Sequence, residues 1–239
     1  NGSVVVSYGE TMVLVAATMG TPREGIDFFP LTMDYREKTS AAGKIPGGFF
    51  KREGRPTTKE ILTMRMMDRP IRPLFPDGFK MDIQIQAFVL SADPELDPDM
   101  AAINGASAAL HISAIPFNGP VGAVRVGQVE GEFILNPTYP ERLVSDLDLV
   151  IVGTENAVTM VECGAKELSE ERMLEAIQFG HEAILELCAL QNELREVAGK
   201  EKAPVTPPQK NDELYGKVFG DYEGAIRTAM ETVGKHAKG

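Results

Sequence analysis

Hydrophobic and polar positions alternate over short segments in the first ninety residues and again after residue 120. This two-residue period, with Val, Ile and Thr prominent, is typical of strands with one face buried. The segments that carry it are 4–7, 11–18, 28–36, 82–91, 121–128, 132–135, 147–152 and 157–163. The last four form two neighbouring pairs with short connections, so the pattern predicts two hairpins in the second half of the chain.

Between these strands the hydrophobic spacing becomes helical. Thr57 and Glu60 have the three-residue spacing of a capping box, which predicts a helix over 57–68. We expect this helix to stop before Pro70, because proline disfavours helical backbone in the residue ahead of it.

Two further helices follow from capping residues and periodicity. Asp99 is the expected N-cap of a helix over 100–112, and the small residues of that helix would allow close approach to a sheet. Ser169 is the expected cap of a long helix that ends at about residue 198. Strands, helices and strands in this order predict an α+β fold with helices packed against a mixed sheet.

The composition changes after residue 200, where Lys and Pro become frequent. We therefore expect a core over 1–202, a linker over 203–210, and a charged, helical segment over 211–239 that begins a small all-α domain. Because the chain opens without Met and directly on a strand, we interpret it as a piece of a longer protein.

Charge is distributed unevenly. The chain of 239 residues has a formal net charge of −11, yet the window 44–72 holds eight cations and three anions, a net of +5, which leaves −16 for the rest. A basic island in an acidic protein indicates that anion binding is confined to one surface.

The centre of this island is a glycine-framed loop. Two aromatic residues, Phe49 and Phe50, are followed directly by Lys51 and Arg52, with Gly47-Gly48 before them and Gly54-Arg55-Pro56 after them. Aromatic faces stack on bases and cations neutralise phosphates, so the pattern indicates a loop that grips single-stranded nucleic acid. The alternative is a strand with two core aromatics and a solvated basic end; the flanking glycines favour a loop.

Three arginines of the following helical segment extend the basic island. Arg65 and Arg69 are four residues apart and share a helix face, while Arg72 follows Pro70. One interpretation is a solvated face paired with acidic neighbours, and the other is a continuation of the cationic path from the loop. The predicted nucleic-acid-binding residues are therefore Phe49, Phe50, Lys51, Arg52, Arg55, Arg65, Arg69 and Arg72.

Other chemistry is not indicated by the sequence. Cys163 and Cys188 are expected to be buried free thiols in a reducing cytoplasm. His111, His181 and His236 lie far apart, without carboxylate or cysteine neighbours at ligand spacing, so no metal site is predicted. No stretch is long enough to span a membrane and no signal peptide is present, so we expect a cytoplasmic protein without membrane partners.

Several longer motifs resemble those of bacterial polynucleotide phosphorylase, and the resemblance runs from the first residues to about 202. They are Asp27-Phe28-Phe29-Pro30-Leu31-Thr32, Ala42-Gly43-Lys44-Ile45-Pro46-Gly47, Phe49-Phe50-Lys51-Arg52-Glu53-Gly54-Arg55-Pro56, Asp68-Arg69-Pro70-Ile71-Arg72-Pro73-Leu74-Phe75-Pro76, Ile103-Asn104-Gly105-Ala106-Ser107-Ala108-Ala109-Leu110, Ile115-Pro116-Phe117-Asn118-Gly119-Pro120 and Leu135-Asn136-Pro137-Thr138. They match the first of that family's two cores, which has an RNase PH-like, ribosomal protein S5 domain 2-like two-layer fold.

The resemblance implies a phosphate-dependent 3′-to-5′ exoribonuclease of messenger RNA that releases nucleoside diphosphates and also runs in reverse. It further implies a homotrimer around a channel, single-stranded RNA and RNA-degradation complex proteins as partners, and Mg²⁺ and inorganic phosphate bound in a second core. The loop with Phe49, Phe50, Lys51 and Arg52 would then form the channel constriction. The family usually has Arg where Lys51 stands. A lysine at this position keeps the positive charge but lacks the planar, forked guanidinium group of arginine.

In this chain the family's catalytic motifs are altered. The turn equivalent to the family's phosphate-binding Gly-Ser-Ser is the acidic stretch 93–99. Asp148 matches one catalytic Asp, but Val150 replaces the catalytic Lys and Arg142 replaces the other Asp. Phosphoryl transfer needs cations and metal at the phosphate, so we expect no catalytic residue here and interpret Asp148 as structural.

Two alternatives belong to other classes. One is a dedicated, non-catalytic RNA-binding ring subunit of an exosome-like assembly, which would end near Gly199, whereas a helical segment after Lys210 indicates a second core downstream. The other is a small-molecule enzyme on the same fold, which would need a convergent polar pocket that the sequence does not show.

Overall fold

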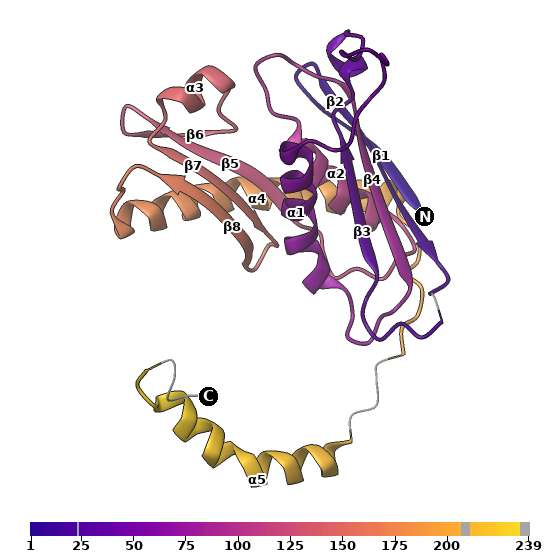
Figure 1. Cartoon of the computed structure of the whole chain (residues 1–239), viewed down its shortest axis with the longest axis vertical. Helices are drawn as coiled ribbons and strands as arrows, with labels where there is room; N and C mark the ends of the chain where they lie inside the picture. Colours follow the sequence, from indigo (N-terminus) through magenta and orange to yellow (C-terminus); the bar gives the residue numbers. More distant parts are fainter. Residues whose placement is uncertain (23, 207–210, 235–239) are drawn as a thin grey trace. The chain divides into compact units, whose positions relative to one another are not determined.

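The computed structural model describes residues 1–22, 24–206 and 211–234. The chain divides into a first compact unit, Asn1–Val205, and a second unit, Thr206–Gly239. The first unit contains two four-stranded sheets, one on each side of its helices α1 and α2 (Figure 1). The predicted α+β class is confirmed, but the single mixed sheet is wrong, because the strands separate into two sheets.

The first sheet combines the four strands that come before residue 92. Its order is β1-β2-β4-β3, and β3 runs parallel to β4 while the other pairs are antiparallel. The strands are β1 (Gly2–Tyr8), β2 (Thr11–Gly20), β3 (Leu31–Arg36) and β4 (Asp82–Ser91). The third strand begins at Leu31 and not at residue 28, since Pro30 has no N–H for the ladder and Phe29 packs against Phe75 and Phe79.

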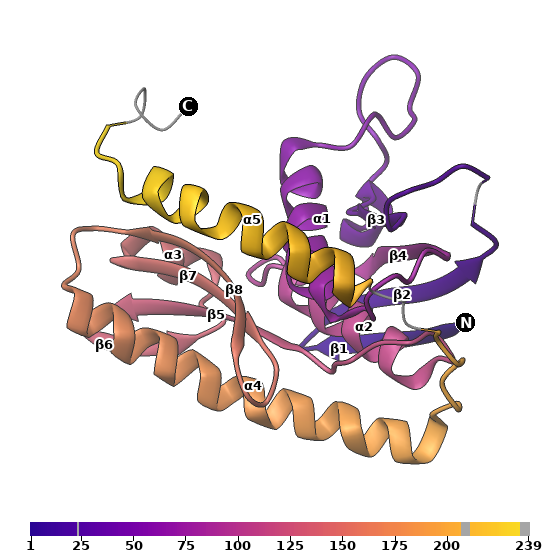
Figure 2. The same cartoon turned by 90° about the horizontal axis from the view of Figure 1, so that it is seen from below.

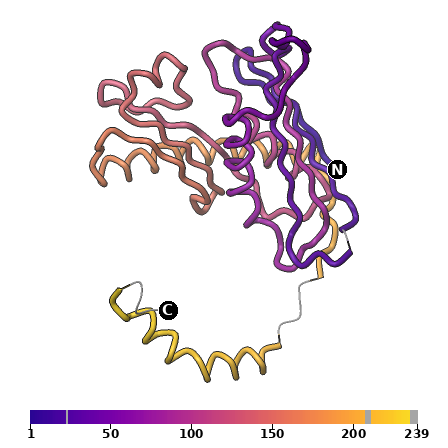
Figure 3. The backbone as a smooth tube through the Cα atoms, viewed as in Figure 1, coloured from indigo at the N-terminus to yellow at the C-terminus, as the bar shows by residue number. Residues whose placement is uncertain are grey.

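The second sheet is wholly antiparallel, in the order β6-β5-β7-β8. Its strands are β5 (Gly122–Val129), β6 (Glu132–Leu135), β7 (Leu147–Gly153) and β8 (Val158–Ala165). Both predicted hairpins are confirmed, one joining β5 to β6 and the other joining β7 to β8. Figure 3 follows the backbone from the first sheet into the second.

Helix α2 (Asp99–Ile112) packs on the first sheet and is almost entirely buried. A Cβ at Gly105 would lie 2.6 Å from Cγ2 of Val15, so the close approach predicted for its small residues is confirmed. The predicted N-cap role of Asp99 is wrong: Asp99 is the first residue of the helix, and Pro98 occupies the cap without a side-chain bond. The buried Asp99 carboxylate pairs with Arg125.

Helix α1 (Thr58–Ile71) begins with the predicted capping box between Thr57 and Glu60. It does not stop before Pro70, which lies inside its last turn. Proline is tolerated there because its missing N–H leaves only one carbonyl of the helix without a hydrogen-bond donor. The chain continues directly into the 3₁₀ helix η2 (Arg72–Leu74).

Helix α4 (Glu170–Ala198) covers the second sheet and extends past it toward α2 (Figure 2). Ser169 caps it by accepting a hydrogen bond from the Arg172 N–H, as predicted. Besides η2, two short helices among the described residues were not predicted: η1 (Thr39–Ala42), within the basic loop, and α3 (Tyr139–Val144).

The start of the predicted linker is docked on the first unit. The Ala203 N–H donates to the carbonyl of Ala114, and Lys202 Nζ donates to three carbonyls at the end of α2. Val205 packs against the hydrophobic cluster that contains the buried residues of the first sheet. Residues 207–210 lie outside the described residues.

The second unit contains the predicted helix, α5 (Asp212–Glu231), capped by Asn211. The prediction extends this helical segment to residue 239, and its last part, 235–239, lies outside the described residues. Across the described part of the chain, no helix has the length and apolar character needed to cross a membrane.

Candidate nucleic-acid interface

The aromatic pair of the basic loop is exposed. Phe49 is 94% and Phe50 74% accessible, and their rings meet edge to face with centroids 5.4 Å apart. The interpretation as core aromatics is therefore wrong. Burying rings of this size is strongly favourable, so two solvent-facing phenylalanines at one site indicate a surface prepared to take up another aromatic or apolar group.

The loop backbone places a cation against one of these rings. Gly48 and Lys51 both have positive φ values, 77° and 49°. Glycine adopts this conformation readily, whereas a lysine does so at a cost, and such strain is concentrated at functional sites. After this turn the Arg52 guanidinium lies 5.1 Å from the centroid of the Phe50 ring. Phe50 and Arg52 thus form a cation–π pair, and Phe49 keeps a free face.

The predicted cations have different partners in the structure. Lys51, Arg52, Arg55 and Arg65 are exposed, and within the described ranges they make no ion pair. Arg69 pairs with Glu162 of β8, and both side chains are about half exposed. A surface pair of this kind contributes little to stability, so a phosphate could displace Glu162 from Arg69.

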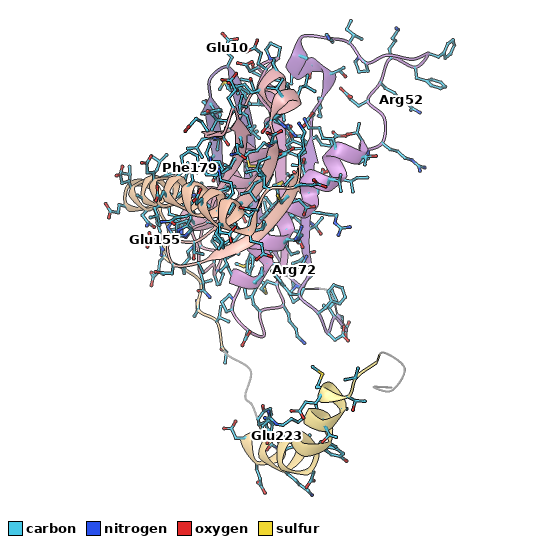
Figure 4. All side chains as sticks on the ribbon, turned by 90° about the vertical axis from the view of Figure 1, so that its left-hand side faces the viewer. Glu10, Arg52, Arg72, Glu155, Phe179 and Glu223 are labelled. Carbon is cyan, nitrogen blue, oxygen red and sulfur yellow. The ribbon has the colours of Figure 1, made fainter. Side chains whose placement is uncertain are left out.

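Arg72 is the exception among the predicted cations. It donates to both carboxylate oxygens of Asp68 and to the carbonyls of Phe29 and Leu31. These bonds tie the end of α1 to the start of β3, and Figure 4 shows Arg72 well away from the projecting loop that carries Arg52. The cationic path that we propose therefore does not include Arg72.

A cleft of about 1130 Å³ lies between α1, α3 and the second sheet, and Arg65 and Arg69 line it from their shared helix face. Its floor holds a set of ion pairs. Arg125 pairs with Asp99 at 2.5 Å and with Asp148, and Arg142 pairs with Asp97 at 3.1 Å and with Asp148 at 3.0 Å. We call these five residues the ion-pair cluster.

Burial and pairing set the protonation of the ion-pair cluster. Burial works against the charge of Asp148, but the guanidinium groups of Arg125 and Arg142 hold its pKa below the ordinary value. Burial also opposes the charge of Arg125, whose pKa is nevertheless raised by Asp99 and Asp148. Lys59 supplies a third cation, with its Nζ 3.1 Å from Asp97 Oδ1, so the three carboxylates are matched by three cations and the cluster has little charge left for a ligand.

Sequence reasoning missed Arg125, which is only 7% exposed in the middle of β5. A signal was present: an arginine within the run Gly122-Ala123-Val124-Arg125-Val126 requires a buried anion beside it. Asp97 and Asp99 belong to the acidic stretch 93–99, and in the structure their carboxylates pair with Arg142 and Arg125 of this cluster.

The remaining candidate residues have local roles. His111 is buried with Nε2 2.9 Å from Asn192 Oδ1, His181 Nε2 lies 3.0 Å from the Thr154 carbonyl oxygen, and His236 lies outside the described residues. Among residues 1–22, 24–206 and 211–234, no group of three or more His, Cys, Asp or Glu could hold a metal ion. Cys188 is buried as expected, but Cys163 is exposed on β8, which is an edge strand of the second sheet.

Two family models match consecutive parts of the chain. Residues 1–116 match domain 1 of the 3′ exoribonuclease family, and residues 119–183 match domain 2. The fold resembles a chain of a solved Archaeoglobus fulgidus exosome with RNA bound to the active site, with a TM-score of 0.62, 19% identity and 82% coverage of both chains. At that identity the likeness shows the fold alone, and it agrees with the predicted RNase PH-like architecture.

Curated relatives are much more similar in sequence. Polyribonucleotide nucleotidyltransferases of Sulfurihydrogenibium azorense, Koribacter versatilis and Persephonella marina are 59%, 53% and 52% identical, over 91%, 95% and 98% of this chain. The matched region makes up 31%, 29% and 33% of those proteins, so this chain spans about a third of their length. The chain therefore belongs to the 3′ exoribonuclease family, with polyribonucleotide nucleotidyltransferases among its relatives.

Proposed function

We propose that this chain is the first core of a phosphate-dependent 3′-to-5′ exoribonuclease, in which it binds single-stranded RNA and does not itself catalyse phosphorolysis. The observation that carries the proposal is the exposed aromatic pair on a cationic loop within an acidic chain. Phe49 offers a ring for base stacking, and Lys51, Arg52 and Arg55, which have no ion-pair partner in the described part of the chain, offer positive charge for phosphates.

The ion-pair cluster supports the non-catalytic part of the proposal. Inorganic phosphate would need free cations, and Mg²⁺ would need free carboxylates. Arg125 and Arg142 are already held by Asp97, Asp99 and Asp148, so the residues present fit neither group. We accordingly place Mg²⁺, inorganic phosphate and bond cleavage in a second core of the longer protein, which would act in the cytoplasm as a homotrimer within the RNA-degradation machinery.

Helix α5 favours this proposal over a free-standing ring subunit. The described residues after 210 form the helix expected of an all-α domain between two cores, and the curated relatives are about three times as long as the match. Arg65 and Arg69 would continue the path of the RNA from the loop along α1.

The test is RNA binding by the purified chain at two salt concentrations, together with the Phe49→Ala/Phe50→Ala variant. We expect salt-sensitive binding to oligo(A) and a loss of about 1–3 kcal/mol per stacked base in the variant. The midpoint of thermal unfolding should be unchanged, since both rings are exposed.

A phosphorolysis assay tests the second half of the proposal. The chain, given oligo(A), phosphate and Mg²⁺, should release no nucleoside diphosphate. Release of nucleoside diphosphate would contradict a non-catalytic core. Absence of binding by the folded wild type would contradict RNA capture by this chain on its own.

A further inference from the structure

The loop between Glu37 and Thr57 is closed at its base by one side chain. The carboxylate of Glu60 accepts the Glu37 N–H through Oε1 at 3.0 Å and the Thr57 N–H through Oε2 at 2.6 Å. Glu60 is 7% exposed. Its burial opposes ionisation, yet the two N–H donors hold its pKa below the ordinary value, so the carboxylate is charged and engaged on both sides. We call this part of the molecule the loop neck.

A second tie joins the loop neck to the cleft. Lys59 Nζ lies 2.8 Å from Glu37 Oε1 and 3.1 Å from Asp97 Oδ1, and it also donates to the Tyr139 hydroxyl at 3.3 Å. The Tyr35 hydroxyl donates to the same Glu37 oxygen at 2.6 Å. Lys59 therefore connects the loop neck to Asp97, which lies outside the loop and belongs to the ion-pair cluster.

A third contact lies nearer the tip. Glu53 Oε1 accepts hydrogen bonds from the Thr39 N–H at 2.9 Å and from its hydroxyl at 2.6 Å. Beyond this point the loop opens into solvent, and Cβ atoms built at Gly43, Gly47 and Gly48 would meet nothing within 4 Å. A tip whose glycines meet no neighbouring atom thus emerges from a neck held by the side chains of Glu60, Lys59 and Glu53.

We propose that Glu60 is a positioning residue for RNA capture, which holds the loop neck closed so that Phe49 and the loop cations are presented in one arrangement. This inference rests on the proposed function. Ordering a loop on binding costs affinity. A neck closed in advance removes part of that cost without touching the RNA.

The substitution Glu60→Gln separates positioning from charge. Glutamine has the same shape, but it replaces one acceptor oxygen by an NH₂ group that would face a backbone N–H, so one of the two neck bonds is lost. Removing an anion near the loop should strengthen RNA binding if charge alone matters. Loosening the neck should weaken binding by about fivefold, so the two effects have opposite signs.

The chain offers a matched control. Glu141 closes a capping box at the start of α3, where its Oε2 accepts the N–H and the hydroxyl of Thr138, both at 2.8 Å. The substitution Glu141→Gln makes the same chemical change at a box that closes no loop. Its affinity for RNA should equal or slightly exceed that of the wild type.

Loop order is measured independently of RNA. Because the chain has no Trp, Phe49→Trp introduces a single indole at the loop tip, and its fluorescence anisotropy reports the motion of the tip. Anisotropy should fall when Glu60→Gln is added and stay constant when Glu141→Gln is added. The dependence of RNA binding on salt should keep its slope in Glu60→Gln, since the loop cations are unchanged.

Weaker RNA binding together with lower anisotropy, in Glu60→Gln only, would support the proposal. Unchanged or tighter binding with unchanged anisotropy would overturn it, as would equal losses in Glu141→Gln. If the wild type bound no RNA, the proposed function would fail and the role of Glu60 in RNA capture would fail with it. Unchanged anisotropy in Glu60→Gln, by contrast, would overturn only the positioning role and leave RNA binding by the wild type intact. If Glu60→Gln did not fold, Glu37→Gln would replace it, because it also removes an anion and weakens the tie to Lys59.

Discussion

The cations of the loop and those of the cleft differ in what neutralises them. Lys51, Arg52 and Arg55 are exposed, and the described residues give them no carboxylate partner. Arg125 and Arg142, in contrast, are held by Asp97, Asp99 and Asp148 within the fold. A count of basic residues would treat both groups as anion-binding, but Lys51, Arg52 and Arg55 have charge available to a phosphate, whereas Arg125 and Arg142 are already paired.

The paired arginines of the cleft bear directly on our proposal that this chain is not catalytic. A catalytic phosphate site has cations that are left unpaired until substrate arrives. In the cleft of this chain, Arg125 and Arg142 are instead paired with carboxylates of the turn before α2, of α2 itself and of β7. The arginines then stabilise the joint between α2, α3 and the second sheet, and the charge available for binding lies on the loop.

The largest expected effect is on stability, at Arg125. In the substitution Arg125→Met the carboxylate of Asp99, which is 2% exposed, stays buried without its cation, and the free energy of unfolding should fall by about 3–5 kcal/mol. Urea denaturation measures this loss. The matched change Arg52→Met on the loop should alter stability by less than about 0.5 kcal/mol.

A second substitution tests the cause. Adding Asp99→Asn to Arg125→Met removes the stranded charge and should restore part of the lost stability. Equal stabilities of Arg125→Met and Arg52→Met would show that the cleft cations are as free as the loop cations, and the comparison would then fail.

The next effect is on RNA affinity. The double substitution Lys51→Gln/Arg52→Gln removes two unpaired charges, so the slope of log affinity against log salt should decrease by about 1.4, from about 0.7 for each phosphate contact on a single strand. Titration of oligo(A) at several salt concentrations gives this slope. Arg142→Gln removes a paired cation and should leave the slope unchanged; an equal decrease there would mean that RNA also reaches the cleft floor.

Local features of the fold could be predicted from the sequence because local chemistry determines them. The capping box at Thr57 and Glu60, the cap at Ser169 and both hairpins depend on residues a few positions apart. The exposure of Phe49 and Phe50 followed from the glycines that flank them.

Features that depend on distant residues could not be predicted in this way. Alternation shows that a segment is a strand without naming its neighbour, so the division into two sheets was not foreseen. The ion-pair cluster joins residues 97, 99, 125, 142 and 148, which only the tertiary structure brings together. For the same reason Arg72, predicted to extend the cationic path, instead bonds Asp68 and two carbonyls at the start of β3.

The smallest expected effect is the pH dependence of the pairing at Asp148. Burial opposes the charge of this carboxyl, but Arg125 and Arg142 lower its pKa in the folded state below the ordinary value of 3.8. A lowered pKa means that its contribution to stability is fully present above 3.8 and is lost as the pH falls through the folded-state value. At pH 7, Asp148→Asn should therefore be less stable than the wild type, by no more than about 1 kcal/mol because the side chain is 42% exposed.

The measurement is urea unfolding of both proteins from neutral pH down into the acid range, and the difference between them should shrink as Asp148 becomes protonated in the wild type. Asp146→Asn is the control, because Asp146 pairs with Lys166 on the open surface, where both side chains are more than half exposed. Its effect should be close to zero at every pH. A difference for Asp148→Asn that stayed constant with pH would show that the arginines do not depend on this charge, and the cleft would then hold free cations as the loop does.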